Sequence, residues 1–179
     1  MARDGIRDSR VLESKALKIK LVLVDCGGVL SESTYYINEN GKESNKFSFR
    51  DLTASALLKE SAKIEVILVN SDRTKSYVRM ANKVSLDDSL IGVKKDSYLI
   101  DKLAAELKIT PDQIAYIGDE LEDIEMMKAV GLAVCPLDAV YEARAAADYV
   151  CNSCGGNGVL REFADFLLSV MKKEACLVG

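Results

Sequence analysis

The feature that most constrains the fold is an alternation of short apolar runs with segments of helical periodicity. The apolar runs have the length of β-strands and carry no regular polar face. Strands that are apolar on both faces, and that are joined by helices, form parallel sheets covered on both sides. We therefore expect an α/β protein. The expected strands are residues 19–25 (IKLVLVD), 64–70 (IEVILVN), 113–119 (QIAYIGD), 132–135 (LAVC) and 147–151 (ADYVC).

Two segments between these strands have recognisable patterns. Residues 95–108 carry apolar side chains at positions 99, 100, 103, 104 and 107, which is the stripe of an amphipathic helix. Residues 33–49 contain Asn40-Gly41 between two strand-like arms, the strongest short-range signal for a β-hairpin. We expect a small hairpin flap over about 33–49, after the first strand.

Length and charge limit the partners. The chain has 179 residues, 49% hydrophobic and 29% charged, which suits one domain with a full core. Lys and Arg number 24 against 28 Asp and Glu, a net charge of -4, so we expect no nucleic acid or membrane partner. The N-terminus is too charged for a signal peptide and the apolar runs are too short to span a bilayer. We expect a cytoplasmic protein.

The chain contains no histidine, which excludes histidine bases and Ser-His-Asp or Cys-His catalysis. Its five cysteines are scattered, and we expect them to be reduced. Cys151 and Cys154 have half of a zinc site's spacing without a second pair, so zinc is not expected. Cys26 is interpreted as a small core residue. Any chemistry rests on carboxylates, lysine, hydroxyls or thiols.

Polar residues collect where the expected strands end. The first strand ends at Asp25, the second runs into Ser71 and Arg73, and the third runs into Asp119 and Asp123. Ligands of parallel sheets bind beyond the carboxyl ends of the strands. Crowded acids repel one another unless a cation bridges them, and a site of oxygen ligands suits magnesium. The sequence thus predicts a Mg²⁺ site at this edge.

The ordered set of motifs resembles that of a known family. Asp25 followed by GGVL, then Ser71, then GDELED at 118–123 are similar to the motifs of the haloacid dehalogenase superfamily of phosphohydrolases. The chain further resembles the 3-deoxy-D-manno-octulosonate 8-phosphate phosphatase subgroup, through its hairpin, Arg50-Asp51 and a late glycine motif at 155–162. It also resembles the phosphatase-like C-terminal domain of sialic acid cytidylyltransferases.

The resemblance covers about residues 17–170 and implies an organisation. It implies a Rossmann-like parallel sheet with a hairpin flap and no large cap domain. We expect an N-terminal extension at 1–16, a haloacid dehalogenase-like domain at 17–173 and a C-terminal tail at 174–179. The family also implies a homotetramer in which the hairpin forms subunit contacts.

The resemblance also implies roles for individual residues. Asp25 is expected to be the nucleophile that forms an aspartyl phosphate. Mg²⁺ is expected to be held by Asp25, the backbone carbonyl of Gly27 and Asp119, with Glu120 or Asp123 acting through water. The candidates for binding phosphate or substrate are Ser71, Arg73, Arg50 and Lys95. Helix capping by Ser71 and a helix-dipole role for Asp123 are the structural alternatives.

Two family positions are altered in this chain. The family has an aspartate two residues after the nucleophile, which protonates the leaving oxygen, and here that residue is Gly27. Losing such a group costs on the order of 10²- to 10⁴-fold in rate. The family also has a lysine about one helix before its Gly-Asp motif, and the residue at that distance before Gly118 is Asp96. We interpret Lys95 in the first instance as a solvated residue at a helix start.

Two functions remain open from the sequence. The first is a Mg²⁺-dependent phosphatase on a sugar-acid phosphate of the octulosonate 8-phosphate or nonulosonate 9-phosphate type, weakened by Gly27. The second is a non-catalytic module for tetramerisation or regulation. A receiver-type domain phosphorylated on aspartate is less favoured, because the hairpin and the late glycine motif have no place in it.

Overall fold

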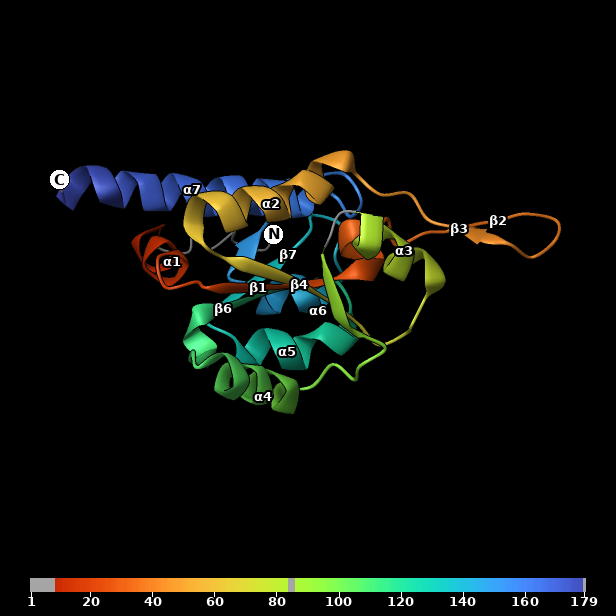
Figure 1. Cartoon of the computed structure of the whole chain (residues 1–179), viewed down its shortest axis with the longest axis horizontal. Coiled ribbons are helices and arrows are strands. Elements are labelled where there is room, and N and C mark those ends of the chain that lie inside the picture. The colour runs from red at the N-terminus through yellow and green to blue at the C-terminus, as the bar shows by residue number, and fades with distance from the viewer. Residues whose placement is uncertain (1–8, 84–85, 179) are drawn as a thin grey trace.

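A six-stranded sheet lies between two layers of helices in the computed structural model, which describes residues 9–83 and 86–178 (Figure 1). The strand order is β5-β4-β1-β6-β7-β8, and each neighbouring pair is parallel. This confirms the predicted α/β, Rossmann-like class. The strands are β1 (Leu21–Asp25), β4 (Glu65–Asn70), β5 (Asp87–Ile91), β6 (Ile114–Ile117), β7 (Leu132–Cys135) and β8 (Tyr149–Val150).

Side chains that alternate along the strands pack into two separate hydrophobic cores, one on each face of the sheet. In β1, Leu21 and Leu23 face the layer of α4, α5 and α6, while Val22 and Val24 face the layer of α1, α2, α3 and α7. All four are buried, and each such side chain stabilises the fold by about 1.5–3 kcal/mol. The helices are α1 (Ser9–Ala16), α2 (Phe49–Ala62), α3 (Lys75–Lys83), α4 (Ser97–Leu107), α5 (Ile124–Ala129), α6 (Tyr141–Ala146) and α7 (Val159–Val178).

The hairpin projects from the body at the end of a long arm (Figure 1). It pairs β2 (Tyr36–Ile37) with β3 (Glu43–Ser44), and its loop places Gly41 at φ 71°. The Asn38 carboxamide accepts the N–H groups of Asn40 and Lys42 and closes the loop. The hairpin is therefore present as predicted. It ends earlier than residue 49, because the Ser48 hydroxyl accepts the Arg50 N–H and starts α2 at Phe49.

Both ends of the described chain are helical. The strand β5 and the helix α1 had no expectation from the sequence, and α7 continues through Val178. Glu13 of α1 lies 3.0 Å from Lys173 of α7, so α1 packs on the domain, while residues 1–8 of the expected extension lie outside the described residues. The boundaries at 16/17 and 173/174 stay predictions. Within residues 9–83 and 86–178, no helix is both long and apolar enough to cross a bilayer.

Candidate active site

Three neighbouring strands bring their carboxyl ends together. Asp25 ends β1, Asn70 ends β4, and Asp119 follows β6. Since β1 pairs with both β4 and β6, these side chains meet at one edge of the sheet. They line a cavity of about 260 Å³ beside the base of the hairpin arm. A larger cavity of about 400 Å³ lies at the opposite, amino-terminal end of β4 and β5, and no acid cluster accompanies it within the described residues.

Three buried carboxylates form the centre of this site. Asp25, Asp119 and Asp123 each offer one oxygen, and these oxygens lie within 4.8 Å of one another. Within the described parts of the chain, Asp119 Oδ1 is buried and has no hydrogen-bond partner, and buried Asp25 Oδ1 has only an ion pair with Lys95 at 3.2 Å. A buried acceptor without a partner is costly unless a cation binds it. The residues therefore fit a hard divalent ion with oxygen ligands.

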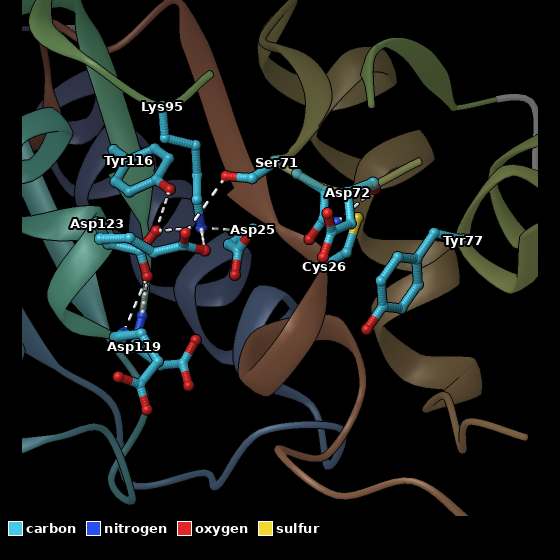
Figure 2. A network of polar contacts seen from close by, with 12 residues as sticks. Asp25, Cys26, Ser71, Asp72, Tyr77, Lys95, Tyr116, Asp119 and Asp123 are labelled. Atoms are coloured by element: carbon cyan, nitrogen blue, oxygen red, sulfur yellow. Dashed lines mark hydrogen bonds and ion pairs between the residues drawn. The ribbon is translucent and has the colours of Figure 1, made fainter. Parts of the chain in front are cut away.

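Asp123 differs from the other two acids because it is fully hydrogen-bonded (Figure 2). Its Oδ2 accepts the N–H groups of Asp119 and Glu120 at 2.8 and 2.9 Å, while its Oδ1 accepts Lys95 and Tyr116. It thus holds the loop that carries Asp119. This geometry favours a positioning role for Asp123, or contact with a metal through water, over direct ligation.

Lys95 lies inside the site, which corrects its interpretation as a solvated lysine. Its side chain is buried, and Nζ lies 3.2 Å from Asp25, 2.7 Å from Asp123 and 2.5 Å from Glu122. Asp96, the residue found by counting, caps α4 by accepting the N–H of Leu99. The loop before α4 therefore presents Lys95, and not Asp96, to Asp25.

The charges of the site are strongly coupled. Burial, and after it the Asp123 carboxylate, raise the pKa of the Asp25 carboxyl, and the Lys95 ammonium opposes this. Burial lowers the pKa of Lys95, but Asp25 and Asp123 outweigh it and hold that pKa above its ordinary value. One ammonium thus faces several acids. A bound cation would complete the neutralisation and keep Asp25 ionised, as a nucleophile requires.

The Asp119 carboxyl has a pKa near neutral pH. Burial, followed by the neighbouring Asp123 charge, raises the pKa of the Asp119 carboxyl to about 7. The Ser33 hydroxyl, which donates to Asp119 Oδ2 at 3.3 Å, acts in the opposite direction. Without a cation, this carboxyl is expected to be partly protonated at neutral pH.

The turn after β1 fits closely around Asp119. Gly28 has φ 72°, and a Cβ atom there would lie 1.9 Å from Asp119 Oδ2, so only glycine is accommodated. Gly27 has φ -75° and ψ 133°, an extended conformation open to any residue. The late glycine motif supports this turn from behind, since the Gly156 N–H donates to the Val29 carbonyl at 2.9 Å. Its Glu162 accepts N–H groups of Asn152 and Ser153 and is structural.

The remaining predicted binding residues are scattered around the site. Ser71 is exposed and contacts Glu122 at 3.3 Å, and Glu122 and Glu120 line the cavity. Arg73 donates to the Ile91 carbonyl and lines a separate cavity on α3. Arg50 is exposed in the first turn of α2. The structure thus brings Ser71 and Lys95 to the acid cluster, and it does not bring Arg73 or Arg50 there within one chain.

Sequence reasoning missed three residues of the site. Glu122 joins Ser71 to Lys95, the buried Tyr116 hydroxyl bonds Asp123 at 2.5 Å, and Tyr77 lines the cavity from α3. Tyr116 stands among the apolar residues of its strand, and Tyr77 reads as one more apolar position of an amphipathic helix. Glu122 lies inside the GDELED motif, which is the sequence signal that points to it.

The cysteines take no part in this chemistry. None of the five forms a disulfide within the described residues, and Cys26, Cys135 and Cys151 are buried. Burial, and next the Asp25 charge, raise the pKa of the Cys26 thiol well above its usual value, so it is a poor nucleophile. Cys151 and Cys154 belong to no group of potential metal ligands within the described residues.

The fold and the acid-lysine cluster define a hydrolase of a known class. The family model of haloacid dehalogenase-like hydrolases matches residues 14–163, and the chain belongs to this family. Among curated proteins, it is similar to 3-deoxy-D-manno-octulosonate 8-phosphate phosphatase of Escherichia coli K12, with 32% identity over 160 residues. These residues make up 89% of this chain and 85% of the relative. The predicted family and subgroup resemblance are thereby confirmed.

Solved structures agree with this assignment. The 3-deoxy-D-manno-octulosonate 8-phosphate phosphatase from Yersinia pestis superposes with a TM-score of 0.84 at 32% identity, covering 91% of this chain and 88% of that one. The enzyme from Moraxella catarrhalis, in complex with magnesium, phosphate and KDO, gives a TM-score of 0.85 at 25% identity, covering 96% and 97%. A cobalt-bound phosphatase from Haemophilus influenzae gives 0.81 at 27% identity, covering 89% and 92%.

Proposed function

We propose that the chain is a Mg²⁺-dependent phosphatase that hydrolyses a sugar-acid phosphate through an aspartyl phosphate on Asp25. The observation that supports this most is the buried Asp25 paired with Lys95 beside the unsatisfied oxygen of Asp119. A nucleophilic carboxylate, its ammonium partner and an acidic cation site are the components that phosphoryl transfer needs.

Each residue has a defined task in this proposal. An Asp25 oxygen attacks phosphorus, and water later hydrolyses the aspartyl phosphate. Asp25, the Gly27 carbonyl and Asp119 are the groups that would hold Mg²⁺, and the ion would neutralise charge on the transferring phosphoryl group. Lys95 holds Asp25 in place, and Asp123 positions both Lys95 and the Asp119 loop. Ser71 and nearby N–H groups are the candidates for phosphate oxygens.

Glu122 has to move when phosphate binds. In the structure its carboxylate lies between Ser71 and Lys95, the two groups expected to contact phosphate oxygens. Its side chain is 56% exposed, so it can leave without breaking a core contact. The substrate phosphate would then take the place of the Glu122 carboxylate beside Lys95.

The substrate class is proposed from the named relatives. A phosphate ester of an octulosonate or nonulosonate acid carries a carboxylate as well as a phosphate. Arg73 and Arg50 remain the candidates for binding that carboxylate. Because neither reaches the acid cluster within one chain, they would act from a neighbouring chain of the oligomer. Gly27 supplies no acid to the leaving oxygen, so turnover of such alkyl esters should be below that of an enzyme with aspartate at this position.

The deciding experiment is phosphate release from 3-deoxy-D-manno-octulosonate 8-phosphate, a nonulosonate 9-phosphate and p-nitrophenyl phosphate, with Mg²⁺ and with EDTA. We expect Mg²⁺-dependent release that Asp25→Asn abolishes. Asp165→Asn, which changes an exposed carboxylate on α7, is the matched control. Release that persists in Asp25→Asn would contradict a mechanism centred on Asp25.

The non-catalytic alternative predicts no release by the wild type under any of these conditions. None of the relatives named above supports it, and a tetramerisation module would not require a buried lysine between acids. The cytoplasmic location and the homotetramer stay predictions.

A further inference from the structure

A tyrosine from another element reaches the place that the missing acid would occupy. Tyr77 lies at the start of α3, and its ring is buried and packs edge-on against Phe47, with ring centroids 6.0 Å apart. Its hydroxyl lines the same cavity as Asp25, Gly27 and Asp119. In Figure 2, Asp25 lies between Lys95 on one side and Tyr77 on the other.

The position of this hydroxyl relative to Gly27 is the central observation. A Cβ atom built on Gly27 would lie 3.3 Å from the Tyr77 hydroxyl oxygen, closer than to any other group. Because Gly27 has an extended backbone conformation, this direction is the one that any side chain at position 27 would take. The phenol oxygen and the carboxyl of an aspartate at 27 would therefore compete for one space.

The hydroxyl is also free to turn toward a substrate. Among the described residues its hydrogen-bonding neighbour is the Ser31 hydroxyl at 3.4 Å, which is long for an O–H···O bond. Ser31 has the carbonyls of Cys26 and Glu32 within reach at 3.3 and 3.2 Å, so its own hydrogen does not depend on Tyr77. Redirecting the phenol hydrogen to a substrate oxygen costs little.

We propose that Tyr77 is a catalytic residue that donates a hydrogen bond to the leaving oxygen of the phosphate ester, in place of the side chain absent at Gly27. In this step an Asp25 oxygen forms a bond to phosphorus while the bond from phosphorus to the sugar oxygen breaks. The electron pair of the broken bond goes to the sugar oxygen, which is stabilised by the Tyr77 O–H and takes its proton from the solvent. The products are the sugar alcohol and the aspartyl phosphate. This inference rests on the proposed function.

The first test is Tyr77→Phe, which removes one oxygen and keeps the ring against Phe47. Turnover of the sugar-acid phosphate should fall by about 10²-fold, the loss typical of one donor to a developing oxyanion. Turnover of p-nitrophenyl phosphate should fall less than about 3-fold, because its leaving group needs little stabilisation. Tyr98→Phe, on the exposed face of α4, is the matched control and should change neither rate. Equal losses on both substrates would overturn the inference, since a structural role affects both alike.

The second test places Gly27→Asp in the wild type and in Tyr77→Phe. If both groups serve the same oxygen, Gly27→Asp should raise alkyl ester turnover by about 10²-fold or more in Tyr77→Phe and by clearly less in the wild type. Equal gains in both backgrounds would overturn the inference.

The same series separates this inference from the proposed function. If Gly27→Asp releases phosphate with Mg²⁺ and the wild type does not, the active site is competent and Tyr77 is not a sufficient donor, so the inference alone fails. If neither protein releases phosphate although both fold, the proposed function fails and the inference fails with it.

Discussion

At the scale of single residues, Lys95 is the centre of the site's electrostatics. It contacts Asp25, Asp123 and Glu122, and only Glu122 among them is exposed. Removing one partner of a buried ion pair leaves the others charged and unpaired, which destabilises a protein more than the pair itself ever stabilised it.

Lys95→Met should therefore reduce both stability and activity. We expect a loss of about 3 kcal/mol in the free energy of unfolding, and a fall in turnover of about 10²-fold or more. Lys94→Met is the matched control, because Lys94 is the neighbouring lysine and its side chain is 84% exposed. Urea denaturation and phosphate release measure the two effects. Similar values for the two variants would show that Lys95 does not have the role assigned to it.

The raised pKa of Asp119 gives a pH dependence of definite sign. The carboxyl has a pKa of about 7 in the folded protein and about 3.9 in the unfolded chain. Between these values the folded state binds the extra proton, so this group's contribution to stability falls as pH rises from about 4 to about 7. Mg²⁺ competes for the same carboxylate and should bind more tightly at about pH 8 than at about pH 5.5.

Thermal unfolding with and without Mg²⁺ at these two pH values measures the effect. The increase in melting temperature caused by Mg²⁺ should be larger at the higher pH. Asp119→Asn should remove most of this increase. Asp165→Asn, on the surface of α7, should leave it unchanged. An increase in Asp119→Asn as large as in the wild type would show that Asp119 is not a ligand.

At the scale of elements, a buried aspartate joins two helices on one side of the sheet. Asp51 of α2 accepts the N–H groups of Gly158 and Arg161, at the start of α7, at 3.0 Å each. Burial raises the pKa of its carboxyl to about 6 against the effect of these hydrogen bonds. The contact therefore fixes the glycine motif that supports the turn after β1.

Asp51→Ala should leave these N–H groups without partners and cost about 2 kcal/mol. Asp165→Ala removes the surface partner of Arg161 on the same helix and should cost less than about 0.5 kcal/mol. Urea denaturation of the two variants compares the costs directly. Equal stabilities would mean that the cap does not hold α7.

The sequence predicted the central apolar strands and the amphipathic helix α4, and it missed β5 and α1. The strand β5 begins with two aspartates at the sheet edge, so it lacks the continuous apolar pattern of the central strands. Asp25, Asp119 and Ser71 were found because strand ends in a parallel sheet meet at one edge. Lys95 was interpreted wrongly and Tyr77 was not considered, because the loop length before α4 and the rotation of α3 are set by packing and not by spacing.

At the scale of the whole molecule, the hairpin leaves apolar side chains without a surface to cover them. Tyr35, Tyr36 and Ile37 are 59–64% exposed, and the two-stranded ladder is too short to be stable alone. This supports the proposed homotetramer, in which the hairpin contacts a neighbouring chain.

Light scattering at micromolar concentration should give the mass of four chains. The double change Tyr36→Ser with Ile37→Ser should shift the protein to smaller species, because it removes apolar contact area. Tyr98→Ser, which changes an equally exposed aromatic residue on α4, should not. A monomer mass for the wild type would rule out the predicted assembly.

The two adjacent glycines after Asp25 differ in their freedom to mutate. Gly28 is fixed by its positive φ and by the Asp119 carboxylate, whereas Gly27 has an ordinary backbone and needs only a small shift of Tyr77 to accept a side chain. In a library of folded variants, position 28 should stay glycine while position 27 varies widely. Catalytic rate can then drift over evolutionary time at one position while the neighbouring metal cradle remains unchanged.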